Sequence, residues 1–173
     1  IMACRSLEKA KVAAVKIQNQ DPNGEVILKQ LDLADLSSVA RFASDFLAKH
    51  TQLDILINNA GVMAIPYRQT ADGFEMQFGT NHLGHFALTA RLFPILQKTP
   101  DSRVVTVSSY AHILGKINFD DLNSEKSYQK WLAYGQSKLA NILFAYELQR
   151  ISSQYGDDPI SVAVHPGYAA TNL

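Results

Sequence analysis

The sequence predicts an α/β fold built on a doubly wound parallel sheet with helices on both faces. Short, nearly continuous apolar segments alternate along the 173 residues with longer segments whose apolar residues recur at helical spacing. Buried strands separated by amphipathic helices are typical of parallel sheets. Because no repeat, low-complexity tract or Pro/Ser/Gly-rich linker interrupts this alternation, we interpret residues 1–173 as a single domain.

Three strands and two helices are predicted in the N-terminal part. Residues 1–4 read as the end of a strand, and Ser6 can cap a helix that the turn at residues 21–24 stops. Residues 26–31 form the second predicted strand and residues 53–57 the third. Each helix carries its apolar residues on one face: Leu7, Ala10, Ala14 and Ile17 in the first, and Val39, Phe42, Ala43, Phe46 and Leu47 in the second.

A long helix is predicted from Asp72 to about Leu96, where Asp72 and Glu75 form an Asp-x-x-Glu variant of the capping box. A strand is predicted next, over residues 103–107, followed by a loop at residues 118–127 and a helix over residues 131–151. A turn at residues 156–159 then leads into the last strand, over residues 160–164.

Polar or small residues follow every predicted strand. They are Arg5, Asp32, the segment 58–61 (Asn-Asn-Ala-Gly), the segment 108–109 (Ser-Ser) and the segment 165–167 (His-Pro-Gly). The carboxyl ends of parallel strands lie at one edge of the sheet, where ligands of doubly wound folds bind. This pattern therefore predicts a nucleotide-binding crevice, although Asp32 also fits a loop-capping acid.

Charge and cysteine content exclude several functions. With 16 basic and 16 acidic residues, the chain lacks the excess of positive charge that nucleic-acid binding needs. No apolar stretch is long enough to span a membrane. The single cysteine, Cys4, and the lack of metal-ligand spacing favour a reducing compartment, so we expect a cytoplasmic protein without a metal site.

Tyr134 and Lys138 lie four residues apart on a predicted helix, so both side chains project from one face. A phenol is a poor acid or base at neutral pH, but a neighbouring ammonium favours its ionised form. Ser109, at a strand end, could orient a substrate oxygen toward Tyr134. Each of these signals alone is weak.

Three other patterns are given ordinary interpretations. His82 and His85 lack the glutamate of a zincin motif, so helix packing accounts for them. Residues 135–137 begin like a hydrolase nucleophile elbow, but position 139 is Leu and Ser137 falls inside a helix. Trp131, Phe144 and Tyr146 read as core or helix-packing aromatics, with contact in a homo-oligomer as the alternative.

Several motifs occur together in a fixed order. They are Asn58-Asn59-Ala60-Gly61, Asn81, Val107-Ser108-Ser109, Tyr134-x-x-x-Lys138 and Pro166-Gly167. This set, over essentially the whole chain, resembles the short-chain dehydrogenase/reductase family and its Rossmann-like fold. The segments 70–75, 80–86 and 137–141 resemble its retinol-dehydrogenase-like branch, which includes the WW-domain-containing oxidoreductase.

The resemblance implies catalytic roles for four residues. Tyr134 would be the acid/base, and Lys138 would favour its ionised form and hold the nicotinamide ribose. Ser109 would position the substrate, and Asn81 would anchor a water-linked proton relay to Lys138.

The resemblance also implies a cofactor site. Asn59, Ala60 and Gly61 would line the cofactor, Asp32 would face adenine, and Pro166, Gly167 and Thr171 would meet the nicotinamide end. Arg5 follows the strand after which a basic residue contacts an adenosine 2′-phosphate, so NADP is favoured and NAD remains the alternative.

From the same resemblance we expect a hydride-transferring oxidoreductase acting on a lipophilic alcohol, aldehyde or ketone. A catalytically silent scaffold with the same fold is the alternative. The family's first strand and its glycine-rich turn have no counterpart in the sequence. We therefore expect a partial domain, in which the sheet is open between the strands at residues 1–4 and 53–57.

Overall fold

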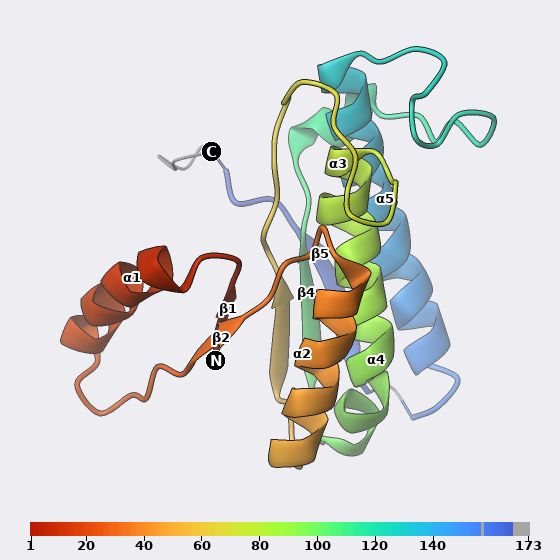
Figure 1. The fold of residues 1–173 in the computed structure, drawn as a ribbon. Helices are drawn as coiled ribbons and strands as arrows, with labels where there is room; N and C mark the ends of the chain where they lie inside the picture. Colours follow the sequence, from red (N-terminus) through yellow and green to blue (C-terminus); the bar gives the residue numbers. More distant parts are fainter. Residues whose placement is uncertain (157, 168–173) are drawn as a thin grey trace.

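A computed structural model describes residues 1–156 and 158–167 (Figure 1). Strands and helices alternate as the apolar pattern predicts. In chain order the elements are β1 (Met2–Cys4), α1 (Leu7–Gln20), β2 (Leu28–Gln30), α2 (Leu36–Lys49), β3 (Ile55–Asn58), α3 (Met76–Phe78), the π-helical turn η1 (Gly79–Leu83), α4 (Gly84–Lys98), β4 (Arg103–Val107), the 3-10 helix η2 (Tyr110–Leu114), α5 (Lys130–Ser152) and β5 (Ile160–Val164).

All pairings between these strands are parallel. β1 pairs with β2, and β4 lies between β3 and β5. Among the described residues β1 and β3 do not pair, and a cavity lies between them. The expected opening in the sheet is therefore confirmed. Figure 1 shows α1, β1 and β2 set apart from the three-stranded sheet.

The hydrophobic core lies between α2, α4, α5 and the sheet. Val39, Leu96 and Val104 are completely buried there. Figure 1 shows α2, α4 and α5 on one side of β3, β4 and β5. The opposite side is only partly covered: Ile55 and Ile57 of β3 are 53% and 60% exposed. In this part of the described chain, the second face of the sheet is therefore covered less fully than the sequence predicts.

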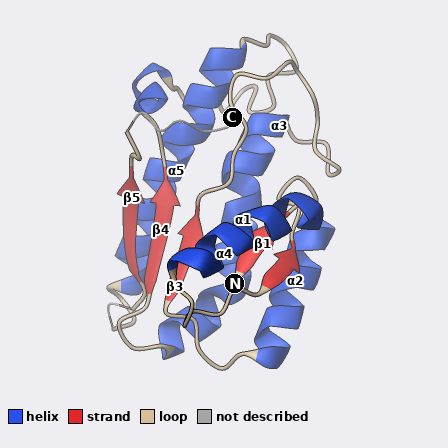
Figure 2. Cartoon of the chain, turned by 90° about the vertical axis from the view of Figure 1, so that its left-hand side faces the viewer, coloured by secondary structure: helices blue, strands red, loops and turns tan. Residues whose placement is uncertain are grey.

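The start of α1 follows the prediction, but its packing does not. The Ser6 hydroxyl accepts a hydrogen bond from the backbone of Lys9, as an N-cap does. Of the predicted apolar face, Ala10 is buried, whereas Leu7 and Ile17 are exposed. Figure 2 shows α1 on the side of β1 and β3 away from α4.

The long helix begins later than predicted and is interrupted. The Glu75 carboxylate accepts hydrogen bonds from the backbone N–H groups of Gln77 and Phe78, at 2.9 and 2.7 Å, so Glu75 caps the helix. Asp72 instead accepts a hydrogen bond from the backbone of Leu36 at the start of α2, at 2.9 Å. The predicted capping box is therefore wrong. The second strand, predicted over residues 26–31, is shortened to β2.

Candidate active site and cofactor site

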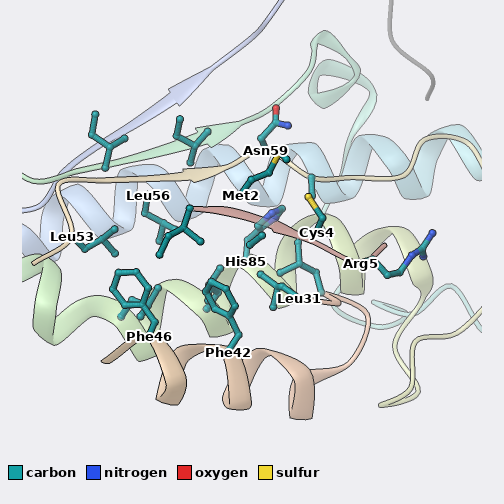
Figure 3. A pocket seen from close by; sticks show the side chains of 18 of the residues that line it. Met2, Cys4, Arg5, Leu31, Phe42, Phe46, Leu53, Leu56, Asn59 and His85 are labelled. Carbon is teal, nitrogen blue, oxygen red and sulfur yellow. The ribbon is translucent and has the colours of Figure 1, made fainter. Parts of the chain in front are cut away.

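A cavity of about 880 Å³ lies between β1 and β3. Its lining includes the five predicted cofactor residues that follow the first three strands, namely Arg5, Asp32, Asn59, Ala60 and Gly61. Figure 3 shows Phe46, Leu53 and Leu56 at one end of the cavity, Arg5 at the other end, and Asn59 between them. The carboxyl ends of β1 and β3 thus meet at one crevice, as the strand-end pattern predicts.

Arg5 and Asp32 differ in how they are held. Arg5 is exposed and forms no ion pair with the described residues. The Asp32 carboxylate accepts a hydrogen bond from the backbone of Ala34, at 2.9 Å, and the Asp32 backbone N–H donates to the Ser38 hydroxyl. Asp32 therefore caps the loop before α2, which is the alternative role raised by the sequence, and it does so at the cavity wall.

Tyr134 and Lys138 lie side by side on α5, and both are buried. The Lys138 Nζ is 5.6 Å from the centroid of the Tyr134 ring and donates a hydrogen bond to the Val107 carbonyl, at 3.2 Å. Burial lowers the pKa of Lys138 from 10.5 to about 8. The structure therefore places a buried cation beside the phenol ring of Tyr134.

Asn81 connects the loop after β3 to α5. Its Oδ1 accepts a hydrogen bond from the backbone N–H of Val62, and its Nδ2 donates to the Val62 carbonyl and to the Ser137 hydroxyl, all within 2.9 Å. A Cβ on Gly61 would lie 3.0 Å from Asn81 Oδ1 and 3.7 Å from Lys138 Nζ. The structure therefore brings Gly61, Asn81 and Lys138 to one place.

Ser109 caps η2, where its hydroxyl accepts a hydrogen bond from the backbone of Ala111 at 3.3 Å. It also lines a second cavity of about 170 Å³ with Tyr110 and His165. η2 is held tightly against α5, because a Cβ on Gly135 would lie only 2.7 Å from the Ala111 carbonyl oxygen. Ser109 is thus fixed relative to the helix that carries Tyr134.

The segment after β5 is only partly described. Pro166 and Gly167 are exposed, and Gly167 has a φ of +75°, which favours glycine. The His165 ring packs edge-on against Tyr110, with centroids 4.2 Å apart. Thr171, a predicted cofactor residue, lies outside the described residues.

Sequence reasoning missed Gln77, one turn before Asn81. Its fully buried amide accepts a hydrogen bond from the backbone of Ala64, at 2.7 Å, and donates to the Tyr128 hydroxyl and the Lys130 carbonyl, both at 2.9 Å. Gln77 thereby fixes the loop after β3 to the start of α5. The only local sequence signal for Gln77 was its spacing of four residues from Asn81, which places both side chains on one face of a helix.

The competing interpretations are resolved by burial. Ser137 is fully buried and donates to the Tyr134 carbonyl, which is incompatible with an exposed hydrolase nucleophile.

Residues 1–156 and 158–167 contain no group of three or more metal-binding side chains. Tyr146, predicted to pack in the core or between helices, is 75% exposed, and this prediction is wrong. No helix in the described part of the chain is long and apolar enough to cross a membrane.

Comparison with known proteins gives concordant results. The sequence model described as short chain dehydrogenase matches residues 1–173. Human retinol dehydrogenase 11 is 49% identical over 99% of this chain and 54% of its own length, and human retinol dehydrogenase 13 is 48% identical over 100% and 52%. The chain thus spans about half the length of these curated relatives.

Solved structures show the same fold. The crystal structure of an uncharacterised protein from Mycobacterium Paratuberculosis is 52% identical, with a TM-score of 0.83 over 99% of this chain and 60% of that chain. A metagenomic short-chain oxidoreductase, solved in complex with NADP, has a TM-score of 0.71 at 20% identity, over 96% of this chain and 69% of its own. The predicted α/β fold class is confirmed.

Proposed function

This chain belongs to the short-chain dehydrogenase family, and we propose that it forms the cofactor and proton-transfer site of an NADP-dependent oxidoreductase. The observation that carries the proposal is the meeting of Gly61, Asn81 and the buried Lys138 beside Tyr134. These contacts place the loop at the carboxyl end of β3 next to Tyr134 and Lys138. Doubly wound folds bind nucleotides at the carboxyl ends of their strands.

The residues present fit a nicotinamide dinucleotide. Because Gly61 has no side chain, a ligand can approach the backbone there, at the wall of the large cavity. Asn59 and Ala60 would line the same part of the cofactor, and the exposed guanidinium of Arg5 would pair with a 2′-phosphate. The metagenomic neighbour of the same fold was solved with NADP, which supports this choice over NAD. When bound, the cofactor supplies or accepts the hydride.

The chain's own residues would manage the proton. The Tyr134 hydroxyl would give a proton to, or take one from, the substrate oxygen, and Lys138 would stabilise the phenolate form by its charge. Ser109 would orient the substrate oxygen through its hydroxyl. Gln77 and Asn81 would hold the loop after β3 against α5, so that the cofactor and Tyr134 keep a fixed separation.

A lipophilic alcohol, aldehyde or ketone is the substrate class that we propose. The relatives named above are retinol dehydrogenases. The segment that follows Ser109 also exposes large apolar side chains that an apolar substrate could contact, namely Tyr110, Ile113, Leu114 and Phe119.

A catalytically silent scaffold is less well supported. Burying an ammonium without a carboxylate partner destabilises the folded protein, as the lowered pKa of Lys138 indicates. A protein that served only as a scaffold would gain stability by losing this lysine, whereas an acid/base site requires it.

Tyr134→Phe in the full-length protein tests the proposal. The change keeps the buried ring and removes the proton donor, so we expect turnover to fall by roughly 100-fold or more. NADPH affinity, measured by fluorescence titration, should stay within about threefold, since one hydroxyl contributes little to it. Tyr146→Phe on the same helix is the matched control, because that side chain is 75% exposed. Retention of more than about a tenth of the wild-type rate would refute the role of Tyr134.

A further inference from the structure

His85 is a buried histidine next to the proposed site, and the proposed function does not use it. Its side chain is 3% exposed, and its Nδ1 lies 2.9 Å from the backbone carbonyl oxygen of Asn81. It lines the large cavity together with Gly61 and Thr80. Figure 3 shows it on α4, among the residues that surround the cavity near Met2 and Cys4.

The hydrogen bond fixes the tautomer of His85. A carbonyl oxygen can only accept, so Nδ1 carries the hydrogen and donates it to Asn81. The other ring nitrogen, Nε2, is then an acceptor. Burial lowers the pKa of His85 to about 4, with the positive charge of Lys138 acting in the same direction, so the ring stays neutral at physiological pH.

The carbonyl that His85 contacts is part of a widened helical turn. Asn81 lies in the π-helical turn η1, where the backbone N–H of Gly84 donates to the carbonyl of Gly79, five residues earlier. Such turns distort the regular hydrogen bonding of an α-helix and frequently occur at functional sites. In this distorted turn, the His85 ring gives the Asn81 carbonyl a side-chain partner besides the helix backbone.

Three of the four hydrogen-bonding positions of the Asn81 side chain are occupied. Its amide makes the three hydrogen bonds to Val62 and Ser137 described above. One lone pair of Oδ1 is still available, and a second acceptor that can hold a water linking Asn81 to Lys138 is the backbone carbonyl oxygen. That oxygen has two lone pairs, and His85 occupies one of them.

We propose that His85 is a positioning residue for proton transfer, which orients the Asn81 carbonyl so that its second lone pair accepts a hydrogen bond from a water on the path to Lys138. This inference rests on the proposed function. His85 acts through Asn81 and touches neither the substrate nor the reacting atoms.

Two substitutions in the full-length protein separate this role from simple packing. His85→Leu fills a similar space and removes the donor, whereas His85→Asn keeps an N–H at the position of Nδ1. We expect kcat to fall about 10-fold in the Leu variant, the size of one hydrogen bond's net contribution, and to recover to within about threefold in the Asn variant. KM and NADPH affinity should change by less than about threefold in both.

The solvent deuterium isotope effect on kcat provides a readout that packing damage would not change. It should increase in the Leu variant, because a disordered proton path makes proton transfer more rate-limiting, and return to the wild-type value in the Asn variant. Leu96→Ala, which opens a hole in the core further along α4 and away from the large cavity, is the control for structural damage. That variant should lose thermal stability while keeping the wild-type isotope effect.

The inference is overturned if the Leu variant keeps kcat within twofold of the wild type, or if the Asn and Leu variants lose activity equally. It is also overturned if the isotope effect in the Leu variant is unchanged. A fully active Tyr134→Phe protein would instead refute the proposed function itself, so the two failures are distinguishable.

Discussion

Replacing Lys138 by Met should stabilise the cofactor-free, full-length protein while it abolishes activity. The lysine is 5% exposed, and burial lowers its pKa from 10.5 to about 8. The pKa difference of about 2.5 means that the folded state at pH 7 is destabilised by about 3 kcal/mol through keeping the ammonium. Methionine removes the charge and retains a flexible apolar chain of similar length.

The hydrogen bond lost in this variant is a minor term. Lys138 Nζ donates to the Val107 carbonyl at 3.2 Å, but the Asn141 amide donates to the same oxygen at 3.1 Å. The carbonyl therefore keeps a partner, and no buried acceptor is left without one. We expect a net gain in the free energy of unfolding of between about 2 and 3 kcal/mol at pH 7.

The gain must depend on pH with a definite sign. Below pH 8 the lysine is protonated in both the folded and unfolded states, and the penalty is at its full size. Between pH 8 and 10.5 the unfolded state binds more protons, so the stability of the wild type rises with pH relative to the variant. The difference should shrink to about 1 kcal/mol at pH 10.

Urea unfolding of both proteins at pH 7 and pH 10 measures these differences. Lys130→Met is the matched control, because Lys130 is exposed at the start of the same helix and its loss should change stability by less than about 0.5 kcal/mol. In turnover assays Lys138→Met should be inactive and should bind NADPH more weakly. A variant that is less stable than the wild type at pH 7, or whose gain is the same at both pH values, would refute the reasoning.

Two further predictions concern the cofactor and the close contacts of the helices. Arg5→Asp should shift preference from NADPH toward NADH, measured as the ratio of the two kcat/KM values, because it replaces a phosphate partner by a repelling charge; an unchanged ratio would make Arg5 an ordinary surface residue. Gly84→Ala and Gly135→Ala should lower the melting temperature, although this exchange inside a helix ordinarily stabilises by about 1 kcal/mol. The added Cβ would lie 2.4 Å from the Leu33 carbonyl oxygen in the first case and 2.7 Å from that of Ala111 in the second. Gly135→Ala should also reduce turnover, since it pushes η2 away from Tyr134, and a stabilised variant at either position would contradict the contacts described.

The order and type of the helices and strands were predictable because apolar periodicity is a local property of the sequence. Element boundaries were less so, since distant contacts decide them. Asp72 has the sequence context of a helix cap, but its carboxylate binds the backbone of Leu36, 36 residues earlier in the chain. Glu75 alone then caps the long helix. The π-helical turn at Asn81 also left no signal in the spacing of apolar residues.

The candidate site was predictable where the rule about strand ends applies. That rule located Arg5, Asp32 and the segment 59–61, which share one cavity. It could not find Gln77, whose hydrogen-bond partners lie 13, 51 and 53 residues away. It also gave no role to His85, because a buried histidine on an apolar helix face has the same sequence pattern whether it packs or orients a neighbour.

Asn81 explains how a nucleotide loop and a catalytic helix, far apart in the chain, keep a fixed separation. Its amide is completely buried and binds both polar backbone groups of Val62 and the hydroxyl of Ser137. Leaving this buried amide without one of its partners would cost about 1 to 3 kcal/mol, so the folded state favours keeping all three contacts. Because Val62 follows Gly61 and Ser137 precedes Lys138, moving either segment breaks the same set of bonds. The position of the proposed cofactor loop and that of the proposed proton-transfer pair are therefore coupled through one side chain, which explains why a polar amide is completely buried at this turn.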